Sequence, residues 1–347
     1  MQSLLKSGAL FEILSFLRKA DRLPLQVLSR DFYSRVIPQS VYEADLSART
    51  RDTLFSYSVE QGSLLYRYRI DTLSWESSHQ AEPRMPIIYS MQLVVTRNNL
   101  VFLMGGAEDE EYNRISDLVY RWDLVTDKLT AVRRMPVAAL DFGACQAHDG
   151  DIYCLGGYRE VTHFTPNEST LRYFLKEDRW EKYPSSPTTA LGRNAKCTLV
   201  SVGGSNPAIY AFFNVPRTFY KLRAGAKLWD RLTIAENALT GIWACGFWVP
   251  RTTQIFIFGG DEELLDQQPG QEGDTLSLLK VLETSTNSVS MCDIQMRDDF
   301  FYFNQVCQSQ GRFFALGKDH VHAINPFSRA YRVHENDGDY GDCDNEV

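Results

Sequence analysis

The apolar residues of this chain fall mostly in short runs rich in Val, Ile, Phe and Tyr, separated by polar segments rich in Gly, Pro, Asp and Asn. Such runs are typical of β-strands. A glycine pair directly follows three of them: residues 100–106 (LVFLMGG), 151–157 (DIYCLGG) and 254–260 (QIFIFGG). From Gly106 to Gly157 is 51 residues and from Gly157 to Gly260 is 103, so one more unit is expected between the last two. The run at 208–214 (AIYAFFN) supplies that unit without the glycines.

Other residues recur with the same period. The tripeptide Arg84-Met85-Pro86 returns at 134–136. The landmarks are an aromatic residue inside a later run (Tyr120, Tyr173, Tyr220), a tryptophan that closes the unit (Trp75, Trp180, Trp229) and a cysteine in the opening run (Cys145, Cys197, Cys245, Cys307). Together they predict six units, at residues 40–79, 87–133, 139–183, 190–232, 240–290 and 300–334.

A glycine pair after the second run, an aromatic residue in the third and a tryptophan in the fourth resemble the kelch family, over residues 40–334. The resemblance implies an all-β fold, a six-bladed kelch-type β-propeller in which each blade is a four-stranded antiparallel sheet. One such sheet cannot bury both of its faces, so blades stack around an axis and cover each other. The four recurring cysteines are expected on the innermost strands. Leu129 stands where the second unit should carry tryptophan, and residues 40–48 are open to two interpretations, the inner strand of the first blade or an outer strand of the last.

Residues 1–39 have a helical pattern instead. Leu10, Ile13, Leu14 and Leu17 fall on one helical face, and Pro24 opens a second apolar helix. This segment resembles an F-box, the helical hairpin that docks on a cullin-ligase adaptor. Two interpretations are open: an F-box-like hairpin, with contact residues Leu10, Ile13, Leu14, Leu17, Leu25 and Leu28, or a helical cap packed on the propeller.

Composition narrows the partners and the compartment. With 36 Lys and Arg against 44 Asp and Glu the net charge is −8, which argues against nucleic acid and favours a basic or neutral protein partner. No apolar stretch is long enough for a membrane span. The seven cysteines include no CxxC pair, as expected of reduced thiols in a cytoplasmic protein, with cytoskeletal association as one setting. The acidic tail at 335–347 is expected to be disordered.

Catalytic chemistry is not indicated. The sequence contains no GxSxG, HExxH or Walker loop, and the only close histidine pair, His320 and His322, lacks the further ligands of a metal site. We therefore expect no catalytic residue, metal or cofactor. A propeller oxidase or hydrolase is the alternative from another functional class.

Charged loops are the candidate partner-binding surface. Acidic residues follow the second run in two units (Glu108, Asp109, Glu110 and Glu111; Asp261, Glu262 and Glu263). In a blade whose strands alternate in direction, these loops and the links to the next blade emerge on one face, where Arg84 and Arg134 add basic points. We expect a non-catalytic scaffold or assembly component that binds proteins with basic segments. The alternative is a substrate receptor of a cullin-type ubiquitin ligase.

Overall fold

The described part of the chain is all strand, turn and loop. The computed structural model describes residues 53–58, 64–69, 74–77, 88–89, 91–96, 100–109, 111–124, 126, 128–160, 165–167, 169–183, 197–213, 218–234, 245–249, 252–258, 276–297, 306–309, 312–316, 320–325 and 330–335. Every strand pairing among them is antiparallel, and none of these residues is helical. The all-β class is therefore confirmed for them, while the expected helical segment 1–39, residues 40–48 and the tail beyond Glu335 lie outside the described residues.

Six sheets hold almost all of the strands, together with a two-stranded ribbon of β10 (Tyr158–Glu160) and β11 (Thr165–Pro166). Sheet I consists of β1 (Thr53–Ser58), β2 (Leu64–Arg69) and β3 (Ser74–Ser77), and sheet II of β4 (Gln92–Val95), β5 (Leu100–Met104), β6 (Val119–Asp123) and β7 (Lys128–Ala131). Sheet III consists of β8 (Gly143–Gln146), β9 (Ile152–Leu155), β12 (Thr170–Phe174) and β13 (Arg179–Tyr183), and sheet IV of β14 (Cys197–Val202), β15 (Ala208–Phe213), β16 (Thr218–Arg223) and β17 (Asp230–Leu232). Sheet V consists of β18 (Cys245–Trp248), β19 (Gln254–Phe258), β20 (Leu276–Glu283) and β21 (Ser288–Arg297), and sheet VI of β22 (Val306–Ser309), β23 (Arg312–Leu316), β24 (His320–Asn325) and β25 (Ala330–Glu335).

In each sheet, strands that follow one another in sequence pair with one another. The sheets fall in successive predicted units, except that β21 runs to Arg297, beyond the predicted end of its unit at residue 290, and β25 ends one residue past 334. In sheet VI the fourth strand, β25, comes from the last unit itself.

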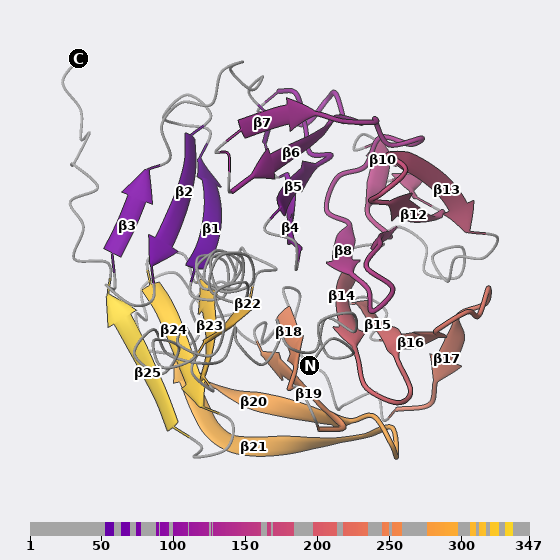
Figure 1. The fold of residues 1–347 in the computed structure, drawn as a ribbon. Helices are drawn as coiled ribbons and strands as arrows, with labels where there is room; N and C mark the ends of the chain where they lie inside the picture. The colour runs from indigo at the N-terminus through magenta and orange to yellow at the C-terminus, as the bar shows by residue number, and fades with distance from the viewer. Residues whose placement is uncertain are drawn as a thin grey trace, which may run out of the picture.

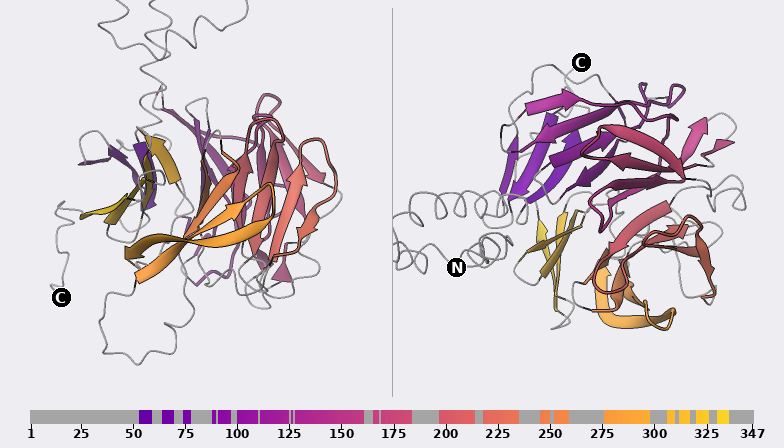
Figure 2. Two further views of the ribbon diagram at one scale, coloured as in Figure 1. Left: turned by 90° about the horizontal axis from the view of Figure 1, so that it is seen from below. Right: turned by 45° about the vertical axis from the view of Figure 1, so that its right-hand side comes forward.

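The sheets stand side by side around a common centre (Figures 1 and 2). The first strands β4, β8, β14 and β18 contact their neighbours in that order, and β1 contacts β22 and β23. Cys145, Cys197, Cys245 and Cys307 lie on β8, β14, β18 and β22, the first strand of each sheet, which is the edge strand nearest the centre in Figure 1.

Apolar side chains fill the spaces between successive sheets from II to VI. Phe102 of sheet II packs with Tyr173 of sheet III, and Leu155 of sheet III with Ile209 of sheet IV. Because both faces are covered, all six residues of β15 are buried. By contrast, every residue of the outermost strand β13 is exposed or half-buried. The core is therefore a series of layers between sheets.

Two of the recurring tryptophans, Trp180 and Trp229, form hydrogen bonds to the preceding sheet or to the segment that follows it. Trp180 donates its indole N–H to the carbonyl of Arg133 in the segment that follows sheet II, at 2.9 Å. Trp229 does the same to the Thr170 hydroxyl of sheet III, at 3.0 Å. In sheet II, Leu129 occupies the corresponding strand and packs against Trp122 in the layer. An indole suits this place because it combines a large apolar surface with one hydrogen-bond donor.

Candidate partner-binding face

The glycine pair of sheet II sets the course of the acidic loop. Gly106 has a φ of +94°, and its N–H donates to the carbonyl of Ala139 at 2.9 Å. A Cβ at Gly106 would lie 2.3 Å from the Tyr89 carbonyl oxygen. Only glycine combines this backbone angle with so close an approach. The β5–β6 loop is thereby pressed against the chain that leads into sheet III.

The same loop is joined to the β7–β8 connection by further contacts. The Met135 N–H donates to the Asp117 carbonyl at 2.9 Å, and Arg134 Nη1 lies 3.2 Å from Asp117 Oδ1. These contacts bring the second-to-third loop and the link to the next sheet together at one end of sheet II, as the alternation of strand direction requires. Arg134 itself remains largely exposed.

Asp109 holds the acidic loop in shape. Its carboxylate accepts the Asn113 N–H at 2.8 Å and the Arg114 N–H at 2.9 Å. The loop turns through Tyr112, which has a φ of +58°. The backbone donor of Asn113 is the main reason why the pKa of Asp109 lies below its usual value. Asp109 therefore works as a turn-capping residue.

Glu108 and Glu111 are the outward-facing carboxylates of this loop. Both are exposed, and Glu111 accepts a hydrogen bond from the Asn113 side chain at 2.9 Å. Among the described residues no cation pairs with Glu108, whereas Arg114 is paired with Asp109 at 3.6 Å. The loop thus presents two solvated negative charges on a backbone that Asp109 and the glycine pair hold in place.

The structure does not place the remaining predicted site residues. Arg84, Glu110, Asp261, Glu262 and Glu263 lie outside the described residues, as do Leu10, Ile13, Leu14, Leu17, Leu25 and Leu28 of the helical segment. The second acidic loop, at residues 261–263, and the F-box-like contact surface therefore stay predictions.

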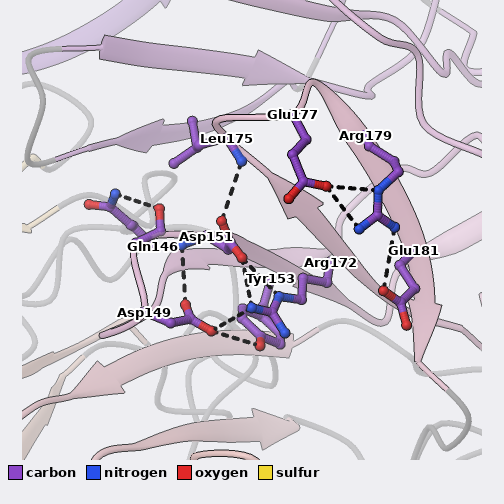
Figure 3. Close-up of polar contacts among 10 residues, drawn as sticks. Gln146, Asp149, Asp151, Tyr153, Arg172, Leu175, Glu177, Arg179 and Glu181 are labelled. Carbon is purple, nitrogen blue, oxygen red and sulfur yellow. Dashed lines mark hydrogen bonds and ion pairs between the residues drawn. The ribbon is translucent and has the colours of Figure 1, made fainter.

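A second polar cluster, which the sequence analysis missed, ties two turns of sheet III together (Figure 3). Arg172 Nε and Nη2 donate to Asp151 Oδ2 at 2.9 and 2.8 Å, and Nη2 also lies 3.1 Å from Asp149 Oδ2. Tyr153 donates its hydroxyl to Asp149 at 3.1 Å, and Asp151 accepts the Leu175 N–H at 3.3 Å. Burial and the Asp149 charge raise the pKa of Tyr153. Because these groups use their hydrogen-bonding capacity on one another, we interpret the cluster as a structural clamp between the two turns.

Among the described residues, histidine and cysteine side chains form no further candidate site. Within the described ranges, no three His, Cys, Asp or Glu side chains gather in a way that suits a metal ion. His320 and His322 lie on β24, the third strand of sheet VI. Cys197 is a free thiol whose Sγ lies 3.0 Å from the Leu155 carbonyl, and burial raises its pKa to about 12. A thiol with that pKa is unreactive at neutral pH.

No protein-family model matches the chain, and no similar sequence was found among curated proteins. None of the described residues forms a helix long and apolar enough to cross a membrane.

Proposed function

We propose that this chain is a six-bladed kelch-type β-propeller that acts as a non-catalytic scaffold or assembly component in the cytoplasm, with cytoskeletal association as one setting. The repeat of glycine pair, tyrosine and tryptophan supports the kelch assignment, and the stacking of neighbouring first strands supports the propeller. Rigid loops on such a framework are where binding residues concentrate.

The observation that carries this proposal is the form of the acidic loop. Glu108 and Glu111 project into solvent from a loop whose backbone is held by Asp109 and Gly106. A loop that is already ordered loses little conformational entropy on binding. Its two carboxylates suit a Lys- or Arg-containing segment of a partner protein. Arg134 lies at the same end of sheet II and would repel the cations of that segment, so we expect the segment to bind on the side of the loop away from Arg134.

A titration of the full chain with a fluorescein-labelled Lys/Arg-rich peptide tests this face. We expect Glu108→Gln/Glu111→Gln to weaken binding several-fold, because each exposed charge pair contributes a few tenths to about 1 kcal/mol. Glu177→Gln/Glu181→Gln is the matched control, since it removes the same charge from exposed positions on the outer hairpin of sheet III. Equal loss in both variants would contradict the proposed face.

The second candidate function is a substrate receptor of a cullin-type ubiquitin ligase, and the apolar pattern of residues 10–28 favours it. Recovery of cullin-adaptor subunits in a pull-down from cell extract separates it from the scaffold. If the segment is F-box-like, Leu14→Asp/Leu28→Asp should abolish that recovery with no change in thermal stability. If it is a cap, the same variant should melt at lower temperature, because charge forced into an apolar contact costs several kcal/mol.

A further inference from the structure

A groove of about 1180 Å³ lies between sheets IV and V. Its walls are the β14–β15 turn, the ends of β15 and β16, the β18–β19 turn and the start of the β20–β21 turn. All of these turns join first to second or third to fourth strands. The acidic loop joins a second strand to a third, so in antiparallel sheets the groove lies at the opposite end of the strands from Glu108.

The charge of the groove is the reverse of the charge of the whole chain. Among the described residues that line it, Lys221 and Arg223 are the charged ones, in a protein with a net charge of −8. Arg223 Nε lies 3.4 Å from Asp230, but both side chains are more than half exposed, so water weakens the pair. The nearby Glu283 carboxylate accepts the Ser285 hydroxyl at 2.8 Å. No carboxylate stands among the described lining residues, so these two cations give the described part of the groove a positive charge.

The remaining walls suit a peptide chain. Trp248 is fixed by its indole N–H, which donates to the Thr252 carbonyl at 3.0 Å. Its ring lies against Gly203, where a Cβ would come within 3.1 Å. Short polar side chains such as Ser205 and Thr253 line the mouth. The turn that follows Arg223 also carries Leu228, which is 66% exposed.

The volume of the groove favours a peptide over a small molecule as its ligand. Small-molecule sites enclose about 300–1,000 Å³ and cover most of their ligand. This groove is larger, and it offers hydrogen-bonding groups and an aromatic wall along its length. An extended segment with alternating carboxylate and apolar side chains matches both the cations and Trp248.

We propose that this groove binds an Asp/Glu-rich segment of a partner protein, with Lys221 and Arg223 contacting its carboxylates and Trp248 its apolar side chains. It is a second binding surface, independent of the acidic loop. The chain would then hold a basic segment at one end of its sheets and an acidic one at the other.

Fluorescence anisotropy of the full chain with a short fluorescein-labelled peptide of Asp, Glu, Ser and Leu tests the proposal. The matched probe carries Asn and Gln in place of Asp and Glu. We expect the acidic peptide to bind more tightly than the amide peptide, and Lys221→Gln/Arg223→Gln to raise its Kd about tenfold. Arg159→Gln/Lys182→Gln removes the same charge from exposed positions outside the groove and should change the Kd less than about twofold.

Two substitutions of one residue should change the affinity for the acidic peptide in opposite directions. Ser205 is exposed at the mouth, so Ser205→Lys should tighten binding and Ser205→Glu should weaken it. Binding of the basic peptide at Glu108 and Glu111 should be the same in all of these variants, so failure of one site is distinguishable from failure of the other.

Three results would overturn the proposal. The first is equal binding of the acidic and amide peptides, and the second is equal loss in the groove variant and its charge control. The third is a preference for another occupant: tighter binding of a single-stranded oligonucleotide, or self-association in sedimentation that both Lys221→Gln/Arg223→Gln and Glu108→Gln/Glu111→Gln abolish. The last outcome would make a second copy of this chain the occupant.

Discussion

At the scale of single residues, glycine and aspartate determine the shape of the loops. Gly106 and Gly157 have positive φ, and a Cβ on either would lie 2.3 Å from a backbone carbonyl oxygen. Asp109 supplies acceptors for two amides in a turn that has no strand to pair with.

Replacing Gly106 by alanine should cost about 2 kcal/mol or more of unfolding free energy. The φ of +94° is unfavourable for any residue with a Cβ, and the clash with the Tyr89 carbonyl adds to it. Gly150→Ala is the matched control, because its φ is +91° but nothing lies within 4 Å of the added Cβ. Urea unfolding should show a smaller loss for Gly150→Ala; equal losses would mean that the close contact is unimportant.

The acidic loop should open only at low pH. The pKa of Asp109 is lowered below its ordinary 3.8, so its contribution is present above that value and is lost as pH falls through the folded-state pKa. Hydrogen exchange of the Asn113 and Arg114 amides should therefore stay slow at neutral pH and quicken in Asp109→Ala, while Glu108→Gln leaves it unchanged. A midpoint for the Asp109 carboxyl above 3.8 by NMR would contradict this role.

At the scale of elements, the layers between sheets depend on aromatic residues that also make hydrogen bonds. Tyr173 is buried against Phe102 of the neighbouring sheet, with ring centroids 5.7 Å apart. Its hydroxyl donates to Asp178 at 2.6 Å, and Asp178 also accepts the Arg133 N–H at 3.0 Å. One turn of sheet III is thus fixed to the chain that leaves sheet II.

Tyr173→Phe should destabilise the protein by about 1–2 kcal/mol, because it removes a hydrogen bond to a charged acceptor. The Tyr173 hydroxyl is also the main cause of the lowered pKa of Asp178. That pKa should rise in the variant, so less stability is lost as pH falls below the ordinary 3.8. Tyr220→Phe, at the matching place in sheet IV, is the control, since its hydroxyl makes no hydrogen bond to the described residues. Urea unfolding at neutral and acidic pH measures both effects.

The clamp of sheet III should require arginine itself. Arg172→Lys keeps the charge but cannot place two N–H groups on Asp151, and it loses the stacking on Phe174, whose ring centroid is 4.4 Å away. We expect a loss of about 2 kcal/mol by thermal melting or urea unfolding. Arg223→Lys, in the exposed pair with Asp230, should change stability by less than about 0.5 kcal/mol. Similar losses in the two variants would argue against the clamp.

At the scale of the whole molecule, the proposed function places sites of opposite charge at opposite ends of the sheets. Exposed charges are screened over about 8 Å at physiological ionic strength. Association of a basic partner with the acidic loop should therefore slow as salt rises, with most of the effect in the on-rate. Stopped-flow binding measures this, and Glu108→Gln/Glu111→Gln should flatten the dependence. A salt-independent on-rate for the unmodified chain would rule out electrostatic attraction.

The sequence by itself determined the all-β class, the order of the sheets and the strands that carry the recurring landmarks. Tyr120, Tyr173 and Tyr220 lie on third strands, and Trp180 lies on a fourth. These features were predictable because a strand, its following turn and its neighbour in an antiparallel sheet are close in sequence. The exposure of Glu108 and Glu111 was predictable as well, because both residues lie in a polar loop between two apolar runs.

Only the tertiary structure decided which charged residues remain available for binding. Asp109 and Glu108 look alike in sequence, yet one is used to cap a turn and the other faces solvent. Arg172 meets its carboxylates from a different strand, and the groove joins Lys221 and Arg223 of sheet IV to Trp248 of sheet V. Hydrogen-bond geometry and packing between separate sheets set these outcomes. Neither hydrogen-bond geometry nor packing between sheets leaves a periodic signal in the sequence. Arg172 and Asp151, like Lys221 and Trp248, are far apart along the chain, and the spacing of acidic residues does not tell a turn-capping carboxylate from a solvent-facing one.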